Sequence, residues 1–315
     1  MGEIDPNPPA DLPCVWILIL HWRGIEHTRA CLQSLSGLSF VNYRVLLVDN
    51  GSDHSDGKTL KAEFCHIELL ILQTNCGFSG GCNAGIEYCL EQEADLVWLL
   101  NNDATVSADT LSLLVEAYEA NPELEMPVKI GAVSAAIVER DEKGSIVRRT
   151  GRGIIDILSA KAKLKSPLSD AVVECDWLSG SSLLLNAQAM REVGFFNDDY
   201  FLYFEDVELC VRLRQAGWRC LLVPQAEIEH LDGASTGDDL KSWRFYYSAR
   251  NRLYFFSSYP NTAVKLFCTA RIFVHFLRHG LTAPFKSKAK RLQLKAEYRA
   301  VRDFLSGKTG KAENI

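Results

Sequence analysis

Short apolar runs that alternate with helix-like patterns constrain the fold of this chain more than any other feature. The run CVWILIL at residues 14–20 is apolar on both faces, which is typical of a strand buried inside a parallel sheet. Similar runs lie at 43–49, 67–72 and 95–100, with helical patterns at about 28–35 and 83–90 between them. Because parallel strands need a crossover connection, this alternation predicts an α/β fold, with a Rossmann-like, mostly parallel central sheet flanked by helices.

The pattern changes after residue 125. Residues 130–186 predict short strands, and a helix at about 205–216 and a strand at 218–224 follow. Beyond residue 242 the pattern is helical, with helices expected at about 242–257, 261–280 and 286–305. We therefore predict a short disordered leader at 1–13, an α/β domain at 14–240 and a basic helical extension at 241–315.

The charge of the chain is divided unevenly. The formal net charge is −6, but residues 241–315 contain 16 Lys and Arg against 3 Asp and Glu, which leaves 18 against 37 for the rest. A basic tail on an acidic body indicates that the tail has a partner of its own. Because aromatic and aliphatic side chains interleave with these bases, we expect residues 241–305 to make peripheral contact with an anionic membrane, and we expect no nucleic acid partner.

The apolar stretch 261–281 is the candidate for a transmembrane helix. It contains Lys265, Arg271 and Arg278, and each charge near mid-span costs about 2.5–3.5 kcal/mol on insertion scales. We expect that this stretch does not span the membrane. It can be an interfacial helix or an ordinary helix packed on the body, and both interpretations remain open.

Ten scattered cysteines without a CxxC pair, and no secretion signal at residues 1–13, predict reduced thiols in a cytoplasmic protein at the inner face of the membrane.

Polar side chains follow three of the predicted strands. They are His21-Trp22-Arg23, Asp49-Asn50 and Asn101-Asn102-Asp103. In an open parallel sheet ligands bind at the carboxyl ends of the strands, so these side chains predict one pocket. Asp49 suits a hydrogen bond to a ribose or a base, but Asp-Asn-Gly is also common turn chemistry, and both interpretations remain open.

Asp103 suits a hard divalent cation. An ion that bridges a diphosphate takes oxygen ligands from one or two carboxylates, and phosphates and waters complete its shell. We expect Mg²⁺ or Mn²⁺ on Asp103, with Asn101 as a weaker partner. His230 follows another predicted strand and joins this site only if the fold brings it near Asp103, because a lone histidine is more often structural.

Residues 75–85 contain four glycines before a helical pattern that we expect to start at Asn83. Glycines in such a turn let an anionic group approach the N–H groups of a helix N-terminus. Tight packing of the helix on the sheet explains the same glycines equally well. The segment is no P-loop, since Gly-Lys-Ser/Thr does not follow.

Aromatic and acidic side chains crowd together in the stretch 195–206, at the start of a predicted helix. Aromatic surroundings reduce the solvation of Glu205 and Asp206, while the helix N-terminus stabilises their charged forms. Such a carboxylate can take a proton from an acceptor hydroxyl. The alternative is an ordinary N-terminal cap, where acids are also frequent.

Taken in order, these segments resemble glycosyltransferase family 2, the inverting enzymes of the GT-A fold, and especially its bacterial rhamnosyltransferase-like branch. The resemblance covers about residues 15–256. It rests on Val48-Asp49-Asn50-Gly51-Ser52, Asn75-x-Gly77-Phe78-x-Gly80-Gly81-x-Asn83, Leu99-Leu100-Asn101-Asn102-Asp103, Gly194-Phe195-Phe196, Tyr203-Phe204-Glu205-Asp206-Val207-Glu208-Leu209 and His230-x-x-Gly233-x-Ser235. The chain departs from the family pattern in two places: Asn101 replaces the first aspartate of the DxD motif, and His21-Trp22-Arg23 replaces an Asn-Tyr-Asn-like triplet.

The resemblance implies a role for each matching residue. Asp206 corresponds to the catalytic base, with Glu205 in support. Asp103, Asn101 and His230 correspond to the metal site. The residues expected to bind the nucleotide-sugar donor are Asp49, Asn50, Gly77, Gly80, Gly81, Asn83, Asn102 and Arg23, and those expected to bind the acceptor are Trp177 and Tyr203.

The implied reaction transfers a sugar with inversion, from a nucleotide-diphosphate donor to a hydroxyl of a lipid-linked or cell-surface glycan. The rhamnosyltransferase-like pattern favours L-rhamnose from dTDP-rhamnose, while a UDP-hexose or a UDP-N-acetylhexosamine remains open. A sugar-nucleotide pyrophosphorylase would need a basic Gly-rich loop after the first strand, where Arg23-Gly24 offers one Arg and one Gly. A non-catalytic, membrane-docked binding protein follows if Glu205 and Asp206 only cap their helix.

Overall fold

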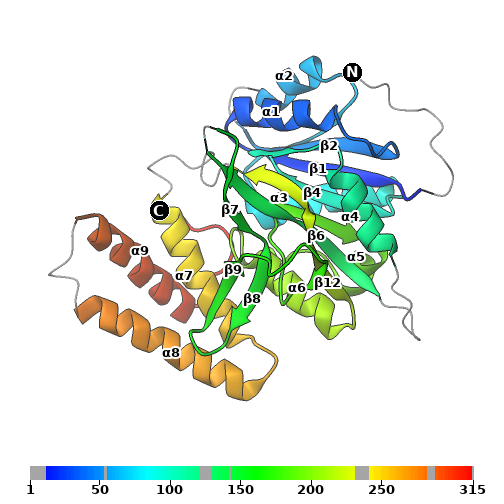
Figure 1. The fold of residues 1–315 in the computed structure, drawn as a ribbon. Coiled ribbons are helices and arrows are strands. Elements are labelled where there is room, and N and C mark those ends of the chain that lie inside the picture. The colour runs from blue at the N-terminus through cyan, green and yellow to red at the C-terminus, as the bar shows by residue number, and fades with distance from the viewer. Residues whose placement is uncertain are drawn as a thin grey trace.

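A mixed β-sheet forms the centre of the computed structural model, which describes residues 12–52, 55–120, 129–141, 143–230, 241–281 and 288–313 (Figure 1). The strands are β1 (Val15–His21), β2 (Tyr43–Asn50), β3 (Glu68–Leu72), β4 (Leu96–Asn101), β5 (Ala104–Val106), β6 (Ile130–Arg140), β7 (Ile146–Thr150), β8 (Arg152–Asp156), β9 (Lys161–Lys165), β10 (Val173–Glu174), β11 (Ser182–Asn186) and β12 (Arg219–His230). The helices are α1 (Ile25–Leu35), α2 (Asp56–Glu63), α3 (Gly77–Glu91), α4 (Thr110–Glu119), α5 (Ala187–Val193), α6 (Glu205–Gln215), α7 (Lys241–Ser257), α8 (Thr262–Leu281) and α9 (Lys288–Leu305). Most of the predicted leader lies outside the described residues, as do Gly233 and Ser235.

The sheet is parallel in its N-terminal half and mixed beyond it. Its order is β10-β12-β6-β11-β4-β1-β2-β3, with β5 beside β12 and β7 beside β6; β8 and β9 pair separately. The strands β3, β2, β1 and β4 are parallel neighbours. β11 runs antiparallel to both β4 and β6, and β6 is again parallel to β12. The prediction of an α/β sheet flanked by helices is confirmed.

Helices cover both faces of the sheet, which explains why the first strand is apolar throughout. Val15, Ile17 and Ile19 of β1 point to one side, where they pack with α1, α2 and α4. Trp16 and Leu18 point to the other side, into a core shared with α3, α5, α6 and the C-terminal helices. Successive side chains of a strand point to opposite faces, so a strand between two layers has no polar side.

Helix α3 begins at Gly77, six residues before the predicted start at Asn83, so the prediction of a glycine-rich turn was wrong. Asn75 Oδ1 accepts a hydrogen bond from Gly77 N at 2.7 Å, and Asn50 Oδ1 accepts one from Cys76 N at 2.9 Å. These side chains satisfy N–H groups that a helix start leaves without intrahelical partners. All four glycines therefore lie in the helix, with Gly77 as its first residue. A Cβ on Gly81 would stand 2.5 Å from Leu20 Cδ1, so this glycine allows α3 to approach β1 closely.

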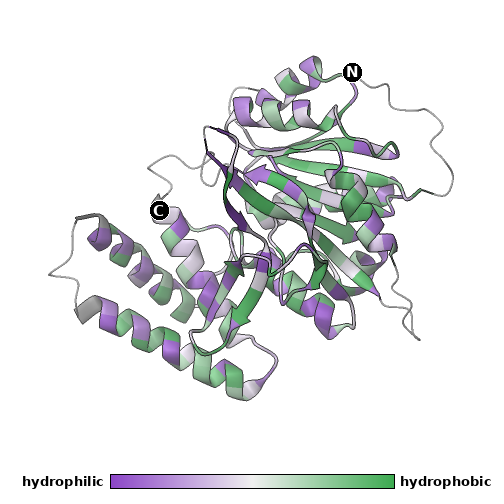
Figure 2. Cartoon of the chain, viewed as in Figure 1, coloured by the Kyte–Doolittle hydropathy of each residue, from purple (hydrophilic) through white to green (hydrophobic). Residues whose placement is uncertain are grey.

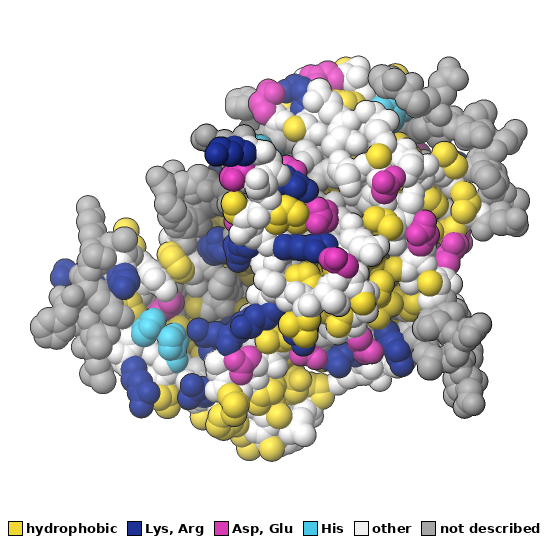
Figure 3. Space-filling model, in the orientation of Figure 1, with side chains coloured by type: hydrophobic (Ala, Val, Ile, Leu, Met, Phe, Trp, Pro, Cys, Tyr) yellow, Lys and Arg dark blue, Asp and Glu magenta, His cyan; other side chains and the backbone are white. Residues whose placement is uncertain are grey.

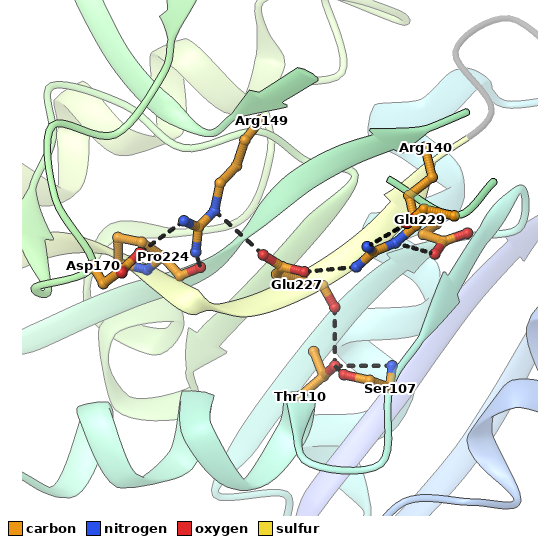
Figure 4. Close-up of polar contacts among 9 residues, drawn as sticks. Ser107, Thr110, Arg140, Arg149, Asp170, Pro224, Glu227 and Glu229 are labelled. Atoms are coloured by element: carbon orange, nitrogen blue, oxygen red, sulfur yellow. Dashed lines mark hydrogen bonds and ion pairs between the residues drawn. The ribbon is translucent and has the colours of Figure 1, made fainter. Parts of the chain in front are cut away.

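Strand β12 continues to His230, six residues beyond the predicted end at 224. Its register against β6 shifts between Val223 and Glu227. Figure 4 shows the Glu227 carboxylate between two arginines, Arg140 at 3.0 Å and Arg149 at 3.4 Å, while Thr110 Oγ1 donates to the Glu227 carbonyl at 3.0 Å. These contacts tie the last part of β12 to β6, β7 and α4. Beyond Glu227, β12 also pairs with β5, where His230 lies opposite Ala104.

The C-terminal extension is helical, as predicted. Helix α7 lies against the body, and α8 and α9 pack on α7 (Figure 1). Figure 2 shows hydrophobic strands in the body, whereas hydrophilic and hydrophobic residues alternate along α8 and α9. No helix in the described part of the chain is both long enough and apolar enough to cross a membrane.

Candidate active site

A pocket of about 250 Å³ lies at the carboxyl ends of β1, β2 and β4, where the sequence predicted one. Its walls come from several distant segments. The predicted site residues that line it are Arg23, Asn50, Gly77, Asn101, Asn102, Asp103, Tyr203 and His230, and further lining residues include Leu20, Trp22, Asn75, Phe78, Phe201, Leu202, Trp243 and Arg244.

Asp103 and His230 meet at one end of this pocket. The distance from His230 Nε2 to Asp103 Oδ1 is 3.0 Å, and the distance from His230 Nε2 to Asn101 Nδ2 is 3.1 Å. The Asp103 side chain is 7% exposed and the His230 side chain 14%, and both line the pocket. The pairing of β12 with β5 brings the histidine to a residue 127 positions earlier in the chain.

Asp103 and His230 could supply two ligands to a divalent cation, whose other ligands would be diphosphate oxygens and waters. Two neighbouring ligands of an octahedral ion with bonds of about 2.1 Å stand about 3.0 Å apart, which matches the separation of Asp103 Oδ1 and His230 Nε2. A carboxylate oxygen suits both Mg²⁺ and Mn²⁺, and an imidazole nitrogen suits the transition metal of the two better. Among the described residues, no group of three or more His, Cys, Asp or Glu side chains could hold a metal ion. The remaining positions of the shell therefore suit phosphate oxygens and waters.

Asp49 forms the turn after β2 and does not line the pocket. Its carboxylate accepts hydrogen bonds from Ser52 N at 2.8 Å, from Ser52 Oγ at 2.9 Å and from Gly57 N at 3.2 Å. Asn50 beside it lines the pocket and donates to the Gly77 carbonyl at 2.9 Å. These contacts give Asp49 a role in the turn, and its hydrogen bond to a ribose or a base stays a prediction.

Asn102 lines the pocket and also ties its wall to neighbouring segments. Its Nδ2 donates to the Arg23 carbonyl at 3.1 Å and to Thr28 Oγ1 at 2.9 Å. Thr28 Oγ1 is also 2.8 Å from His21 Nδ1. Burial lowers the pKa of His21, which is fully buried. The end of β1 is thus held by a buried polar network, while Trp22 and Arg23 face the pocket.

Besides Asp49 and the two carboxylates of α6, four predicted site residues do not line the pocket. Gly80 and Gly81 lie inside α3. Asn83 joins α3 to the loop before α6, since its amide exchanges hydrogen bonds with Phe196 N and O at 2.9 and 2.8 Å. Trp177 is 7% exposed, packs in the core and donates to the Ile154 carbonyl at 3.3 Å. Packing of α3 and of the core accounts for these residues.

Glu205 and Asp206 begin α6. Asp206 Oδ2 accepts from Gly180 N at 3.1 Å, and Oδ1 accepts from Val207 N at 2.8 Å. Burial raises the pKa of Asp206 to about 6, although both N–H groups oppose the rise. Glu205 is 5% exposed, and its Oε2 has no hydrogen-bond partner among the described residues. Burial and the neighbouring Asp206 charge raise the pKa of Glu205 well above its ordinary value.

The structure brings Asp206 to the same edge of the sheet as Asp103. Asn101 N donates to the Ser181 carbonyl at 3.0 Å, and the preceding residue, Gly180, donates to Asp206. A Cβ on Gly180 would lie 3.1 Å from Phe78 Cζ and 3.8 Å from Asp206 Cβ, so Gly180 lies between Asp206 and a ring of the pocket wall. Asp206 is therefore connected to the end of β4 through Gly180 and Ser181, next to Phe78 of the pocket wall.

Sequence reasoning missed the part of the wall that α7 supplies. The rings of Trp22 and Trp243 stack, with centroids 6.2 Å apart and 19° between their planes. The Arg23 guanidinium lies 4.2 Å from the centroid of the Trp22 ring. Trp243 and Arg244 carry no local sign of a pocket, because only the docking of α7 on the body brings them there.

The sheet and the site at its strand ends define a glycosyltransferase of the GT-A fold. The chain is similar in structure to GalNAc-T7 with UDP, GalNAc and Mn²⁺, at a TM-score of 0.57 and 14% identity, over 87% of this chain and 58% of that one. It is also similar to the mannosyltransferase PcManGT of Pyrobaculum calidifontis in complex with GDP-Man and Mn²⁺, at a TM-score of 0.56 and 12% identity, over 98% and 91%.

The sequence narrows this class to one family. The profile described as "Glycosyl transferase family 2" matches residues 17–142, and "Glycosyl transferase family group 2" matches residues 96–288. The chain belongs to glycosyltransferase family 2, and the predicted rhamnosyltransferase-like branch is confirmed by its relatives. It is 29% identical to the N-acetylglucosaminyl-diphospho-decaprenol L-rhamnosyltransferase of Mycobacterium tuberculosis, over 68% of this chain and 74% of that one. It is 27% identical to the rhamnosyltransferase WbbL of Escherichia coli, over 76% and 94%.

Proposed function

We propose that this glycosyltransferase moves L-rhamnose from dTDP-rhamnose to a hydroxyl of a lipid-linked glycan, with inversion at the anomeric carbon. The names of its relatives support the donor and the acceptor: one is the decaprenol-linked rhamnosyltransferase above, and another is the dTDP-rhamnosyl transferase RfbF of Shigella flexneri, 23% identical over 88% of this chain. The observation that carries the proposal is the pocket that has Asp103 and His230 at one end, with Asp206 near Phe78 of its wall.

The donor diphosphate lies at the Asp103 end of the pocket in this proposal. Asp103 and His230 would hold Mg²⁺ or Mn²⁺, with Asn101 as a weaker ligand. The bound ion would neutralise negative charge on the departing diphosphate. Asn50, Gly77, Asn102 and Arg23 shape the wall along which the nucleotide lies, while Asp49, Gly80, Gly81 and Asn83 act at a distance by fixing that wall.

Asp206 is the proposed general base, and Glu205 supports it. Above pH 6 Asp206 is ionised, since its pKa is about 6, and it takes the proton of the acceptor hydroxyl. The oxygen then bonds to the anomeric carbon as the bond from that carbon to dTDP breaks on the opposite face. The raised pKa of Glu205 favours its uncharged form, which lessens its repulsion of the developing negative charge. Tyr203 contacts the acceptor in this arrangement.

Helix α8 is the proposed contact with the membrane, at its inner face. Leu266 and Leu277 are 66% and 65% exposed and lie eleven residues apart, on the same side of the helix. Lys265, Arg271 and Arg278 are exposed on the same helix, and Figure 3 shows basic and hydrophobic side chains together over the extension. Each base near an anionic surface adds about 1 kcal/mol of attraction.

A donor panel tests the proposed reaction. The purified protein is given Mn²⁺, a polyprenyl-linked acceptor and dTDP-rhamnose, UDP-glucose or UDP-N-acetylglucosamine, and nucleoside diphosphate release is measured. Acceptor-dependent release of dTDP supports the proposal, whereas release of UDP alone would replace the proposed donor.

Vesicle binding tests the membrane contact. The double variant L266E/L277E should lose binding to vesicles of phosphatidylcholine and phosphatidylglycerol, while V147E/L168E, a control pair on the body, should keep it.

A further inference from the structure

The loop that precedes Glu205 has an unusual backbone. Phe201, Tyr203 and Phe204 have φ angles of 61°, 69° and 75°. Left-handed backbone is unfavourable for large side chains, and residues in it persist only where the surroundings impose it. Phe201, Leu202 and Tyr203 line the pocket, and the loop ends at the two carboxylates, so its shape determines the site.

Asn251 of α7 binds this loop from the side of the extension. Its Nδ2 lies 2.8 Å from each of three main-chain carbonyl oxygens, those of Tyr200, Leu202 and Tyr203. The Asn251 side chain is fully buried. Because one amide group serves the carbonyls on both sides of the turn, it fixes their relative directions and hence the left-handed residues among them.

Arg250 adds a second set of bonds. Its Nη2 donates to the carbonyls of Asp199 and Tyr200 at 3.2 Å, and its Nη1 donates to the Gly310 carbonyl at 2.8 Å. The guanidinium lies 5.0 Å from the centroid of the Tyr247 ring and is fully buried. Gly310 N in turn donates to the Asp199 carbonyl at 2.7 Å, so the end of the chain joins the same contacts.

The opposite side of the loop rests on α3. Phe78 N donates to the Phe201 carbonyl at 2.7 Å. A Cβ on Gly77 would stand 2.3 Å from this carbonyl oxygen, so the contact needs a glycine. The loop is thus held between the start of α3, which belongs to the nucleotide side of the pocket, and α7, which belongs to the extension.

We propose that Arg250 and Asn251 are positioning residues of the transfer reaction, which hold the loop 199–204 and its three left-handed residues in place and thereby place Tyr203 in the pocket and Asp206 beside it. The C-terminal extension then completes the active site, in addition to any contact with a membrane. The inference rests on the proposed role of Asp206 as the base.

Two variants and a matched control test this role. R250K and N251L remove bonds to the loop. R252K is the control: Arg252 lies on the same helix and donates to the Ala160 and Ser159 carbonyls at 2.6 and 3.0 Å, so it holds a different segment, the turn between β8 and β9. For each protein we would measure kcat and the donor KM, the pH profile of kcat, the melting temperature and hydrogen exchange at the amides of residues 199–204.

We expect R250K and N251L to lower kcat by about 10²-fold, the usual cost of a misplacement near 1 Å, with a smaller change in donor KM. Loop amides should exchange faster, and the acid limb of kcat should move to lower pH as water reaches Asp206. R252K should leave kcat unchanged, and its loop amides should exchange as slowly as in the wild type. This should hold even if R252K lowers the melting temperature as much as R250K does. If N251L does not fold, the comparison of kcat and loop exchange between R250K and R252K decides whether Arg250 positions the loop.

Equal kcat and equal loop exchange in R250K and R252K would overturn the proposal. A wild-type protein that turns over no donor would instead remove the proposed function. Loop exchange in R250K against R252K does not depend on turnover, so it would still decide whether Arg250 holds the loop.

Discussion

Replacing Asp206 with asparagine removes the proton acceptor and keeps the size of the side chain. In the native structure the two carboxylate oxygens accept from Gly180 N and Val207 N. Asparagine can accept only one of these bonds, so a small loss of stability is expected besides the loss of the base. A general base contributes about 10²–10⁴-fold, which corresponds to about 3–5 kcal/mol of activation free energy.

The pH profile of the wild type provides a second measure of the same residue. Burial raises the pKa of Asp206 to about 6 from an ordinary value of 3.8, so kcat should fall as the pH drops through 6 and the base becomes protonated. Glu205 and Cys210 face Asp206. The pKa of each of these groups is raised, which favours its uncharged form. Because the charges of Glu205 and Asp206 interact, the fall in kcat at acid pH reports the first ionisation of the pair.

The assay is steady-state release of dTDP from pH 5 to pH 9, with donor binding measured separately by calorimetry. D206N should lose about 10²–10⁴-fold in kcat, bind the donor nearly as well as the wild type and show no limb near pH 6. Wild-type kcat in D206N, or the same acid limb in both proteins, would refute the assignment of the base.

Three other changes have outcomes that follow from the structure. D103A and H230A should both weaken dTDP-rhamnose binding and remove the extra thermal stabilisation by Mn²⁺, because their side chains are 3.0 Å apart in one cluster; a Mn²⁺ response equal to the wild type in thermal-shift measurements would contradict this. G77A should lose about 1–3 kcal/mol of unfolding free energy, through positive φ and a clash with the Phe201 carbonyl, whereas G37A, whose Cβ would meet no atom within 3.8 Å, should stay near the wild type in urea denaturation. The pKa of Glu205 is raised in the folded protein, so its contribution to stability is complete below the unfolded pKa and is lost as the pH rises through the folded value. E205Q should therefore melt higher than the wild type at pH 8 and at the same temperature as the wild type at pH 4. The same difference in melting temperature at both pH values would contradict a buried, protonated carboxyl.

The sheet and its strand ends could be predicted because their signals are local. A run such as 14–20, apolar on both faces, can be buried only between two layers of helices, and the structure places helices on both faces. The polar residues after β1, β2 and β4 therefore had to meet at one edge. Asp103, Asn50 and Arg23 line the pocket for this reason.

The remaining features depend on contacts between distant segments. Pro224 and the charged residues after it obscured the end of β12, and only its pairing with the three-residue strand β5 shows how His230 reaches Asp103. The start of α3 at Gly77 depends on Asn50, a side chain of another strand. In the sequence Asn251 is one polar residue of a predicted helix, and its contact with the loop at 199–204 becomes visible only in the folded structure.

The structure of the protein with dTDP, Mn²⁺ and an acceptor analogue would test the account most directly. The account predicts that the ion lies between Asp103 Oδ1 and His230 Nε2, that the diphosphate continues from it into the pocket, and that the acceptor hydroxyl lies within hydrogen-bond distance of Asp206. A diphosphate bound elsewhere, or an acceptor hydroxyl held by another base with Asp206 turned away, would contradict it.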